Sequence, residues 1–169
     1  MEAQAKTWGD NLAKRMVEVL YDEEANLFRD VLVETGEKLS IITPANFVPL
    51  LAEVPIAEEK AQAMIQTYLL DSTKLFGSVP FPSVAYDEPT YVPAKPGKPH
   101  DLTWRGPTWM PMAWMMLEVL RKYEFDTERQ RAADRLYELM IQDGELHELF
   151  NSQTGEGIGI PQLGWTAAI

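Results

Sequence analysis

The sequence contains no cysteine and only two histidines, His100 and His147. A disulfide framework and a thiolate zinc site are therefore excluded, and two imidazoles are too few for a histidine-built metal centre. No apolar run reaches the length of a membrane-spanning helix, and the N-terminus is polar rather than signal-like. From these absences we expect no metal or other cofactor, no membrane contact and a cytoplasmic protein.

Positive charge is also scarce in this chain. Fifteen lysines and arginines stand against 26 aspartates and glutamates, which gives a formal net charge of −11 at pH 7. Such a chain repels the phosphates of nucleic acids and of anionic membranes, so we expect neither as a partner. The length of 169 residues and the hydrophobic content of 46 % suit a folded chain with a real core. We expect a single domain over residues 1–169.

Helical periodicity dominates the parts of the chain that carry apolar residues. The segments expected to be helical are 3–20, 46–51, 57–70, 108–122 and 127–141. The segment 108–122 is apolar nearly all round, which is typical of a helix buried on most sides. Thr127 and Gln130 fit a capping box, and residues 31–42 allow either a short β-hairpin or an extended loop. The pattern predicts an all-α protein with five or six helices.

The expected helices are separated by one long connection, residues 72–107, which shows no helical periodicity. It holds seven of the chain's twelve prolines. A connection of this length inside a compact protein is usually functional or disordered, and its aromatic residues argue against disorder throughout. We therefore expect functional residues in this segment and at the helix that follows it.

The end of this connection carries the most distinctive residues of the chain. Trp104 and Trp109 offer flat apolar faces with one N–H donor each, and Arg105 offers a planar fork of donors. Gly106 lets the backbone come close to another group. Flat faces with a few aimed donors suit a polyhydroxylated ring such as a sugar. A loop packed over a core helix, with Arg105 as a structural tie, explains the same residues equally simply.

A second group of candidates lies near the C-terminus. Glu148 follows His147 and precedes an apolar pair and a glycine-rich turn, a setting in which a carboxylate can act as a general base. An exposed glutamate on a short strand explains the same pattern. Gln162 and Trp165 add an amide and an aromatic face, for which packing is the alternative role.

Four segments taken together resemble the C-terminal part of glycoside hydrolase family 63. The motif Trp-Arg-Gly-Pro-x-Trp and the motif Glu-x-Phe-Asn-x-x-Thr-Gly-Glu-Gly are the most specific of these. The family includes processing α-glucosidases and the mannosylglycerate and glucosylglycerate hydrolases, and trehalases share its wider clan. The segments, in chain order, are 82–91, 104–109, 147–157 and 162–168.

The resemblance implies a fold and a set of roles. The fold is an (α/α)6 toroid, of which this chain would form a part, and its central pocket hydrolyses α-linked sugars with inversion. Glu148 falls on the family's general base, which activates the attacking water. The positions expected to line the sugar subsite are Trp104, Arg105, Gly106, Trp109, Gln162 and Trp165.

The chain also departs from the family pattern. A toroid of twelve helices needs roughly twice this length or more, and the family's general acid lies in an upstream Trp/Met-Asp-Asn-Ser-Pro segment that these 169 residues lack. Loss of general-acid assistance costs on the order of 10²–10⁴-fold in rate. We therefore expect the C-terminal half of a glycosidase barrel that binds carbohydrate and hydrolyses it weakly or not at all alone.

Two alternatives stay open at this stage. One is an α-glycoside hydrolase whose pocket is completed by a homodimer or by a complementary N-terminal half. The other is a non-catalytic helical interaction protein in which the sugar motifs serve packing alone. Self-association is expected because a partial toroid leaves lateral helix faces without partners, and a two-fold dimer is the commonest closed assembly.

Overall fold

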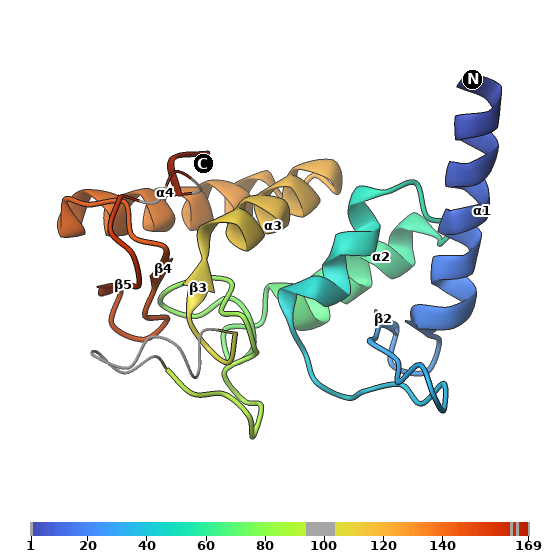
Figure 1. The fold of residues 1–169 in the computed structure, drawn as a ribbon, viewed down its shortest axis with the longest axis horizontal. Coiled ribbons are helices and arrows are strands. Elements are labelled where there is room, and N and C mark those ends of the chain that lie inside the picture. The colour runs from blue at the N-terminus through green and yellow to red at the C-terminus, as the bar shows by residue number, and fades with distance from the viewer. Residues whose placement is uncertain (1, 94–103, 163, 165, 169) are drawn as a thin grey trace.

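A computed structural model describes residues 2–93, 104–162, 164 and 166–168 of the chain. Helices account for most of the ordered elements, and the described strands are each two residues long (Figure 1). The helical elements are α1 (Glu2–Leu20), η1 (Pro44–Leu51), α2 (Glu58–Met64), η2 (Ile65–Leu69), α3 (Met110–Lys122), α4 (Asp126–Asp143) and η3 (Thr166–Ala168). The strands are β1 (Tyr21–Asp22), β2 (Leu27–Phe28), β3 (Thr108–Trp109), β4 (Leu149–Phe150) and β5 (Gly157–Ile158).

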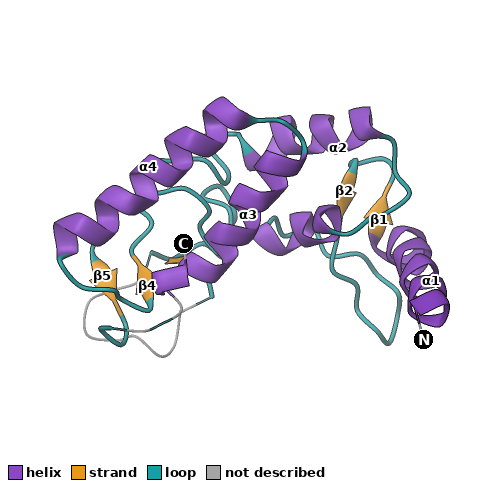
Figure 2. Ribbon diagram, turned by 90° about the horizontal axis from the view of Figure 1, so that it is seen from above, coloured by secondary structure: helices purple, strands orange, loops and turns teal. Residues whose placement is uncertain are grey.

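The elements form two groups along the longest axis of the molecule (Figures 1 and 2). At one end α4 runs beside α3, and the sheet β3–β4–β5 lies below them in Figure 1. At the other end α1 stands upright, with its N-terminus pointing away from the rest of the chain. The elements η1 and α2 lie between the two groups. The expected all-α fold is confirmed.

The core is built mainly around η1, α3 and α4. α3 packs against both η1 and α4, and Met110, Met116 and Leu120 on its inner side are fully buried. Lys122, at the end of α3, donates hydrogen bonds of 2.8 Å to the carbonyls of Leu50 and Ala52. Those carbonyls lie at the C-terminal end of η1, where carbonyl groups have no hydrogen-bond partner within the helix. The side-chain amine therefore ties the two helices together.

The expectation that 108–122 is buried on most sides is only partly right. Residues 108–109 form strand β3, and the helix begins at Met110. Trp114 lies on the outer side of this helix with 44 % of its surface exposed. An apolar sequence shows which residues can be buried, but the neighbouring elements decide which side is covered.

The sequence pattern predicted the C-terminal end of α4 correctly but not its N-terminal cap. The capping box at Thr127 is wrong, because the N-cap is Phe125 and makes no side-chain capping bond. The backbone N–H of Phe125 donates to the Leu120 carbonyl at 2.9 Å, and this turn starts the helix at Asp126, before a cap at Thr127 could act. Gly144 ends the helix in the left-handed conformation, with φ of 72°, as glycine does most easily.

The paired strands after α1 lie earlier than the expected hairpin. β1 and β2 pair through Tyr21 with Phe28 and Asp22 with Leu27. The Asp22 carboxylate accepts hydrogen bonds from the N–H groups of Glu24 and Ala25, both 3.1 Å long, which fixes the turn between the strands. Residues 31–42 form a loop closed by one bridge between Val31 and Lys38.

Candidate functional site

The three-stranded sheet brings β3 beside β4, whose paired residues are 40 or more positions apart in the sequence. β3 pairs with β4 through Thr108 with Phe150 and Trp109 with Leu149, and β4 pairs with β5. Trp109, Leu149 and Ile158 form a small buried apolar cluster on this sheet. Glu148 directly precedes Leu149, so its backbone lies next to the strand that carries Trp109.

The two tryptophans of the Trp-Arg-Gly-Pro-x-Trp motif stack on each other. Their ring centroids are 4.2 Å apart and their planes differ by 4°. Trp109 is 5 % exposed and anchored in the sheet, whereas Trp104 is 54 % exposed. Such a stacked pair is worth about 0.5–1.5 kcal/mol beyond the area it buries. Trp109 therefore supports Trp104, and one face of Trp104 is left open.

Gly106 allows the backbone between the two tryptophans to be held tightly. Its N–H donates to the Ser83 hydroxyl at 3.0 Å, and a Cβ at this position would lie 2.2 Å from the carbonyl oxygen of Val92. Val92 in turn donates its N–H to the Arg105 carbonyl at 2.7 Å. Any residue larger than glycine would collide with backbone rather than with a movable side chain.

The segment 76–93 is fixed in place by Tyr86. Its hydroxyl lies 2.6 Å from the Val79 carbonyl oxygen and 2.7 Å from that of Ser152, which follows β4. Burial, and secondarily the nearby Tyr91, raise the pKa of Tyr86 far above its ordinary value. The hydroxyl therefore stays protonated and available as a donor. The Tyr91 hydroxyl lies 2.8 Å from the Ser152 hydroxyl.

Glu148 is half-buried at the edge of the sheet. Its backbone N–H donates to the Ile160 carbonyl at 3.0 Å, and its Oε2 lies 3.4 Å from the backbone nitrogen of Ile160. A Cβ on Gly159 would lie 2.7 Å from the same oxygen, so the glycine makes room for the carboxylate. These contacts place the carboxylate over the chain that follows β5. The roles implied by the family resemblance require Glu148 to face the same cleft as Trp104 and Arg105, and this stays a prediction.

Three further residues were predicted to line the sugar subsite. Arg105 is exposed, and its Nε donates to the Thr90 carbonyl at 3.3 Å, which is the structural tie considered from the sequence. Gln162 has a φ of 61°, in the left-handed region. Trp165 lies outside the described residues.

A cavity of about 200 Å³ opens beside Trp104. Its wall combines this ring with residues from the start of η1, from the segment before β3 and from α3. The lining residues are Thr43, Pro44, Ala45, Ser83, Trp104 and Met112. Thr43 and Met112 were not among the predicted site residues, because no local signal in the sequence places the start of η1 against the Trp104 loop.

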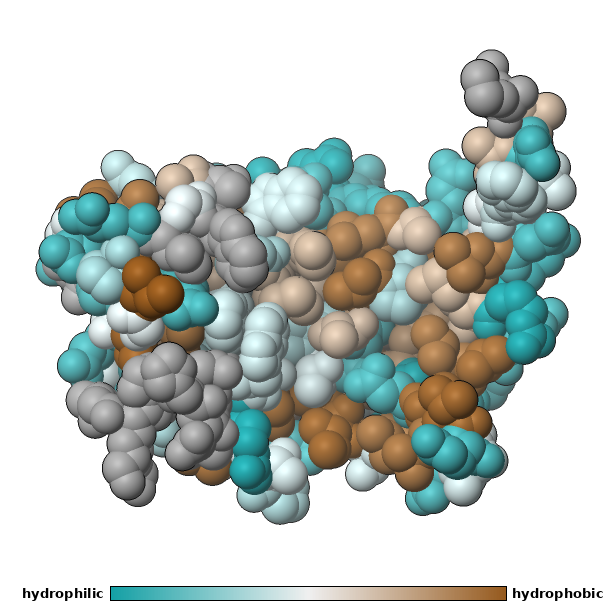
Figure 3. Space-filling view, in the orientation of Figure 1, coloured by the Kyte–Doolittle hydropathy of each residue, from teal (hydrophilic) through white to brown (hydrophobic). Residues whose placement is uncertain are grey.

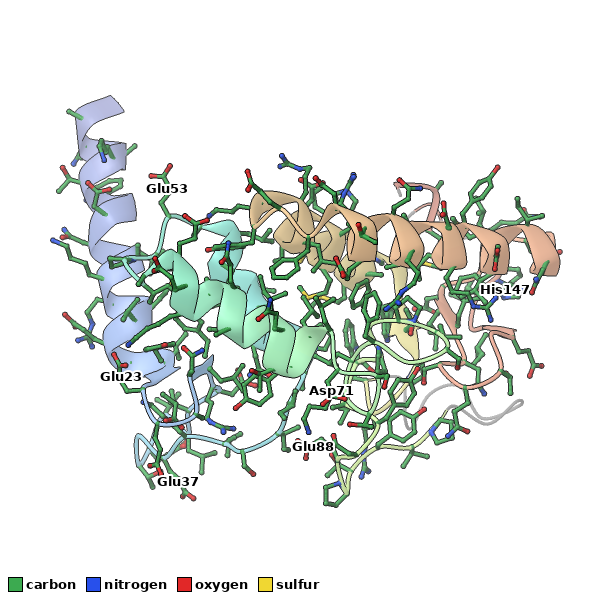
Figure 4. All side chains as sticks on the ribbon, turned by 180° about the vertical axis from the view of Figure 1, so that it is seen from behind. Glu23, Glu37, Glu53, Asp71, Glu88 and His147 are labelled. Atoms are coloured by element: carbon green, nitrogen blue, oxygen red, sulfur yellow. The ribbon has the colours of Figure 1, made fainter. Side chains whose placement is uncertain are left out.

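The acidic side chains of the described residues do not gather into a cation site. Figure 4 labels Glu23, Glu37 and Glu53 at the α1 end of the chain, far from His147 beside the candidate base. Within residues 2–93, 104–162, 164 and 166–168, no group of three or more histidine, aspartate or glutamate side chains is placed to hold a metal ion. Every helix within those residues is too short or too polar to span a bilayer.

Known proteins resemble this chain over nearly its whole length. Residues 1–166 match the mannosylglycerate hydrolase MGH1-like glycoside hydrolase domain. Mannosylglycerate hydrolase MGH1 of Selaginella moellendorffii is 34 % identical over 170 residues, which are 99 % of this chain and 32 % of that protein. Mannosylglycerate hydrolase of Rubrobacter radiotolerans is 28 % identical over 157 residues, covering 93 % of this chain and 34 % of the relative.

A solved structure gives the same result. The GH63 mannosylglycerate hydrolase of Thermus thermophilus, in complex with glucose, superposes with a TM-score of 0.76 at 30 % identity. The superposition covers 90 % of this chain and 36 % of that one. This chain thus spans about a third of the length of the relatives it matches, with the helical fold of part of such an enzyme. Sequence and structure agree that the chain belongs to the mannosylglycerate hydrolase MGH1-like glycoside hydrolase family.

Proposed function

We propose that this chain supplies a sugar-binding surface and the general base of an inverting α-glycosidase acting on mannosylglycerate or a related α-glycoside. The observation that carries the proposal is the Trp104–Trp109 stack, which holds an open aromatic face at the mouth of a cavity. The apolar side of a pyranose ring can pack on this face. Arg105, Gly106, Gln162 and Trp165 are proposed to complete the sugar subsite.

Glu148 is proposed as the base. In an inverting glycosidase one carboxylate activates water while a second carboxylic acid protonates the leaving group. Glu148 directly precedes the strand paired with β3, in the motif that the resemblance assigns to the base. Its backbone N–H and its Oε2 both contact the backbone of Ile160, and these contacts position the carboxylate. No acid partner is assigned in this chain, and hydrolysis of natural substrates by the chain alone should be weak or absent.

The test uses substrates that differ only in their need for the acid. A glycosyl fluoride has a leaving group that departs without protonation, so the base alone suffices for its hydrolysis. We expect the purified chain to hydrolyse α-mannosyl or α-glucosyl fluoride with inversion, and mannosylglycerate about 10²-fold or more slowly. Glu148→Gln should remove the fluoride activity, and Glu156→Gln on the neighbouring turn should keep it.

Two outcomes would count against this function. If neither fluoride is hydrolysed, or if Glu148→Gln retains full activity, Glu148 is not the base. Robust hydrolysis of mannosylglycerate that disappears in Glu148→Gln would instead show that an acid is supplied, and would favour a pocket completed by a second chain.

Completion by another chain has its own structural support. α1 exposes Trp8 by 65 % and Leu12 by 63 %, and the α3–α4 face exposes Trp114 by 44 % and Ile141 by 59 %. Figure 3 shows apolar residues gathered on the face between α3 and α1. We propose that residues 1–169 act as one unit whose lateral helix faces are covered by a second copy or by a complementary N-terminal part.

Sedimentation equilibrium at micromolar concentration tests self-association. A mass of twice 19.2 kDa is expected for the dimer, and Leu12→Gln should shift the equilibrium toward the monomer. A clean monomer over the whole concentration range would exclude the homodimer.

A further inference from the structure

A second cavity lies away from the candidate sugar site, between the segment after η2 and the side of α4. Its volume is about 380 Å³. The lining residues are Ser72, Phe76, Gly77, Ser78, Pro80, Arg131, Ala132 and Arg135. None of them belongs to the proposed sugar subsite, so a ligand bound here would be independent of the glycosidase function.

Two arginines on α4 give this cavity its charge. Arg131 and Arg135 are four residues apart, so they project from the same face of the helix. The Arg131 guanidinium lies over the Phe76 ring, 4.6 Å from its centroid. The Arg135 Nε donates to the Ser78 carbonyl at 2.9 Å. Each side chain therefore contacts the opposite wall of the cavity, Arg131 from an exposed position and Arg135 from a half-buried one.

The positive charge of the cavity is only partly neutralised within the described chain. Arg135 forms one ion pair of 3.2 Å with Glu138, whereas no described carboxylate lies within ion-pair distance of Arg131. The nearby acid Asp71 accepts hydrogen bonds from the N–H and hydroxyl of Thr73, both 2.7 Å. Of the two arginines, only Arg135 therefore has a carboxylate partner among the described residues.

The facing wall adds uncharged donors. Ser72 and Ser78 line the cavity, and within the described residues neither hydroxyl takes part in a hydrogen bond. The backbone N–H groups of Gly77 and Ser78 likewise donate to no described carbonyl. Guanidinium forks together with hydroxyl and backbone N–H donors are the groups that bind tetrahedral oxyanions.

We propose that this cavity binds a phosphate group, with Arg131 as the main charged contact and Arg135 and the two serines as additional donors. The volume exceeds what one phosphate ion fills, so a small phosphate monoester fits the cavity better than the free ion. The site lies between α4 and the segment that leads to the Trp104 loop, so an occupied cavity would hold these two elements together.

Thermal unfolding at constant ionic strength tests the site. Inorganic phosphate and glycerol 3-phosphate are titrated against chloride on the full chain. At about ten times Kd, the bound anion should raise Tm by about 3–6 °C. Tighter binding of glycerol 3-phosphate assigns the site to monoesters, and equal binding assigns it to free phosphate.

Arginine variants decide whether the effect comes from this cavity. Arg131→Gln should weaken binding about tenfold or more, because it removes the guanidinium without a described ion pair. Arg121→Gln on α3 makes the same charge change elsewhere and should leave binding unchanged. The Arg131 side chain donates to no described backbone carbonyl, so its variant is expected to fold. No anion effect in the parent chain, or an equal effect in Arg131→Gln, would overturn the proposal.

Discussion

The two ends of this molecule are held together in different ways. Around the sheet β3–β4–β5, segments distant in sequence are joined by Gly106 to Ser83 and by Tyr86 to Ser152. Along α1 the side-chain ion pairs are local, such as the pair that Lys6 forms with a residue one turn away. The candidate sugar site is thus shaped by the chain itself, whereas the apolar side of α1 lacks cover over its first half within the described residues. The same kind of substitution should therefore have opposite consequences at the two ends.

Glycine-to-alanine changes give the strongest contrast. At Gly106 a new Cβ would lie 2.2 Å from the Val92 oxygen, which is backbone and has little room to move. Gly106→Ala should therefore destabilise the chain by about 3 kcal/mol, a Tm loss of about 6–12 °C. At Gly9, on α1, the new Cβ would meet no described atom within 4 Å other than its chain neighbours and the backbone of its own helix.

Gly9→Ala is the matched control for this comparison. Alanine is the better helix former, so this variant should gain about 0.5–1 kcal/mol. Thermal unfolding of both variants measures the difference. Equal Tm values for Gly106→Ala and Gly9→Ala would show that the Trp104 loop is not tightly held.

Removing the Tyr86 hydroxyl should have the next largest effect. Tyr86→Phe leaves the carbonyls of Val79 and Ser152 without this partner, at a cost of about 1–3 kcal/mol. Tyr137→Phe removes a hydroxyl from an exposed side chain on α4 and should change stability by less than about 0.5 kcal/mol. Urea unfolding midpoints compare the two, and similar losses would refute the role given to Tyr86.

Alkaline pH should act through the same hydroxyl. The folded-state pKa of Tyr86 is raised by burial above the ordinary value of 10.0, so the folded state keeps a proton that the unfolded state releases. This stabilisation is complete below pH 10 and is lost as the pH rises toward the folded-state pKa. Stability should therefore fall above this pH by up to about 1.4 kcal/mol per pH unit. The fall should be shallower in Tyr86→Phe; an unchanged slope would assign it to other groups.

The smallest effect on stability is expected on α1. Leu12 is 63 % exposed, so Leu12→Gln should change the free energy of unfolding of the monomer by less than about 0.5 kcal/mol. If a second copy covers this face, the same change should raise the dissociation constant of the dimer about tenfold, by loss of about 1.5 kcal/mol of burial. Unfolding in dilute solution and sedimentation separate these effects. A large loss of stability in dilute solution would show that Leu12 packs within its own chain.

The sequence predicted the helices well because their signals are local. Periodic apolar residues located α1, α3 and α4, and Gly144 marked the end of α4. Local rules failed where a distant segment decides the outcome. The predicted cap at Thr127 does not form, because the turn at Phe125 starts the helix earlier. The exposure of Trp114 depends on which side of α3 the neighbouring elements leave uncovered.

In the candidate site, too, the sequence indicated individual residues but not the contacts that distant segments make. The family resemblance singled out Trp104, Trp109 and Glu148. The structure stacks the two indole rings and pairs β3, which carries Trp109, with the strand that follows Glu148. The stacking, however, requires the bend at Gly106 that Val92 and Ser83 hold in place. The start of η1, some 60 residues away in sequence, also contributes to the cavity wall, and only its packing brings it there.

Sugar binding at the open face of Trp104 tests the central claim most directly. Isothermal titration of the chain with mannosylglycerate should show saturable binding, weakened about tenfold or more in Trp104→Ala by loss of the stacking face. Trp114→Ala removes an indole of similar exposure on the outer side of α3 and should bind as the parent does. No saturable binding by the parent chain, or equal binding by Trp104→Ala, would contradict the account.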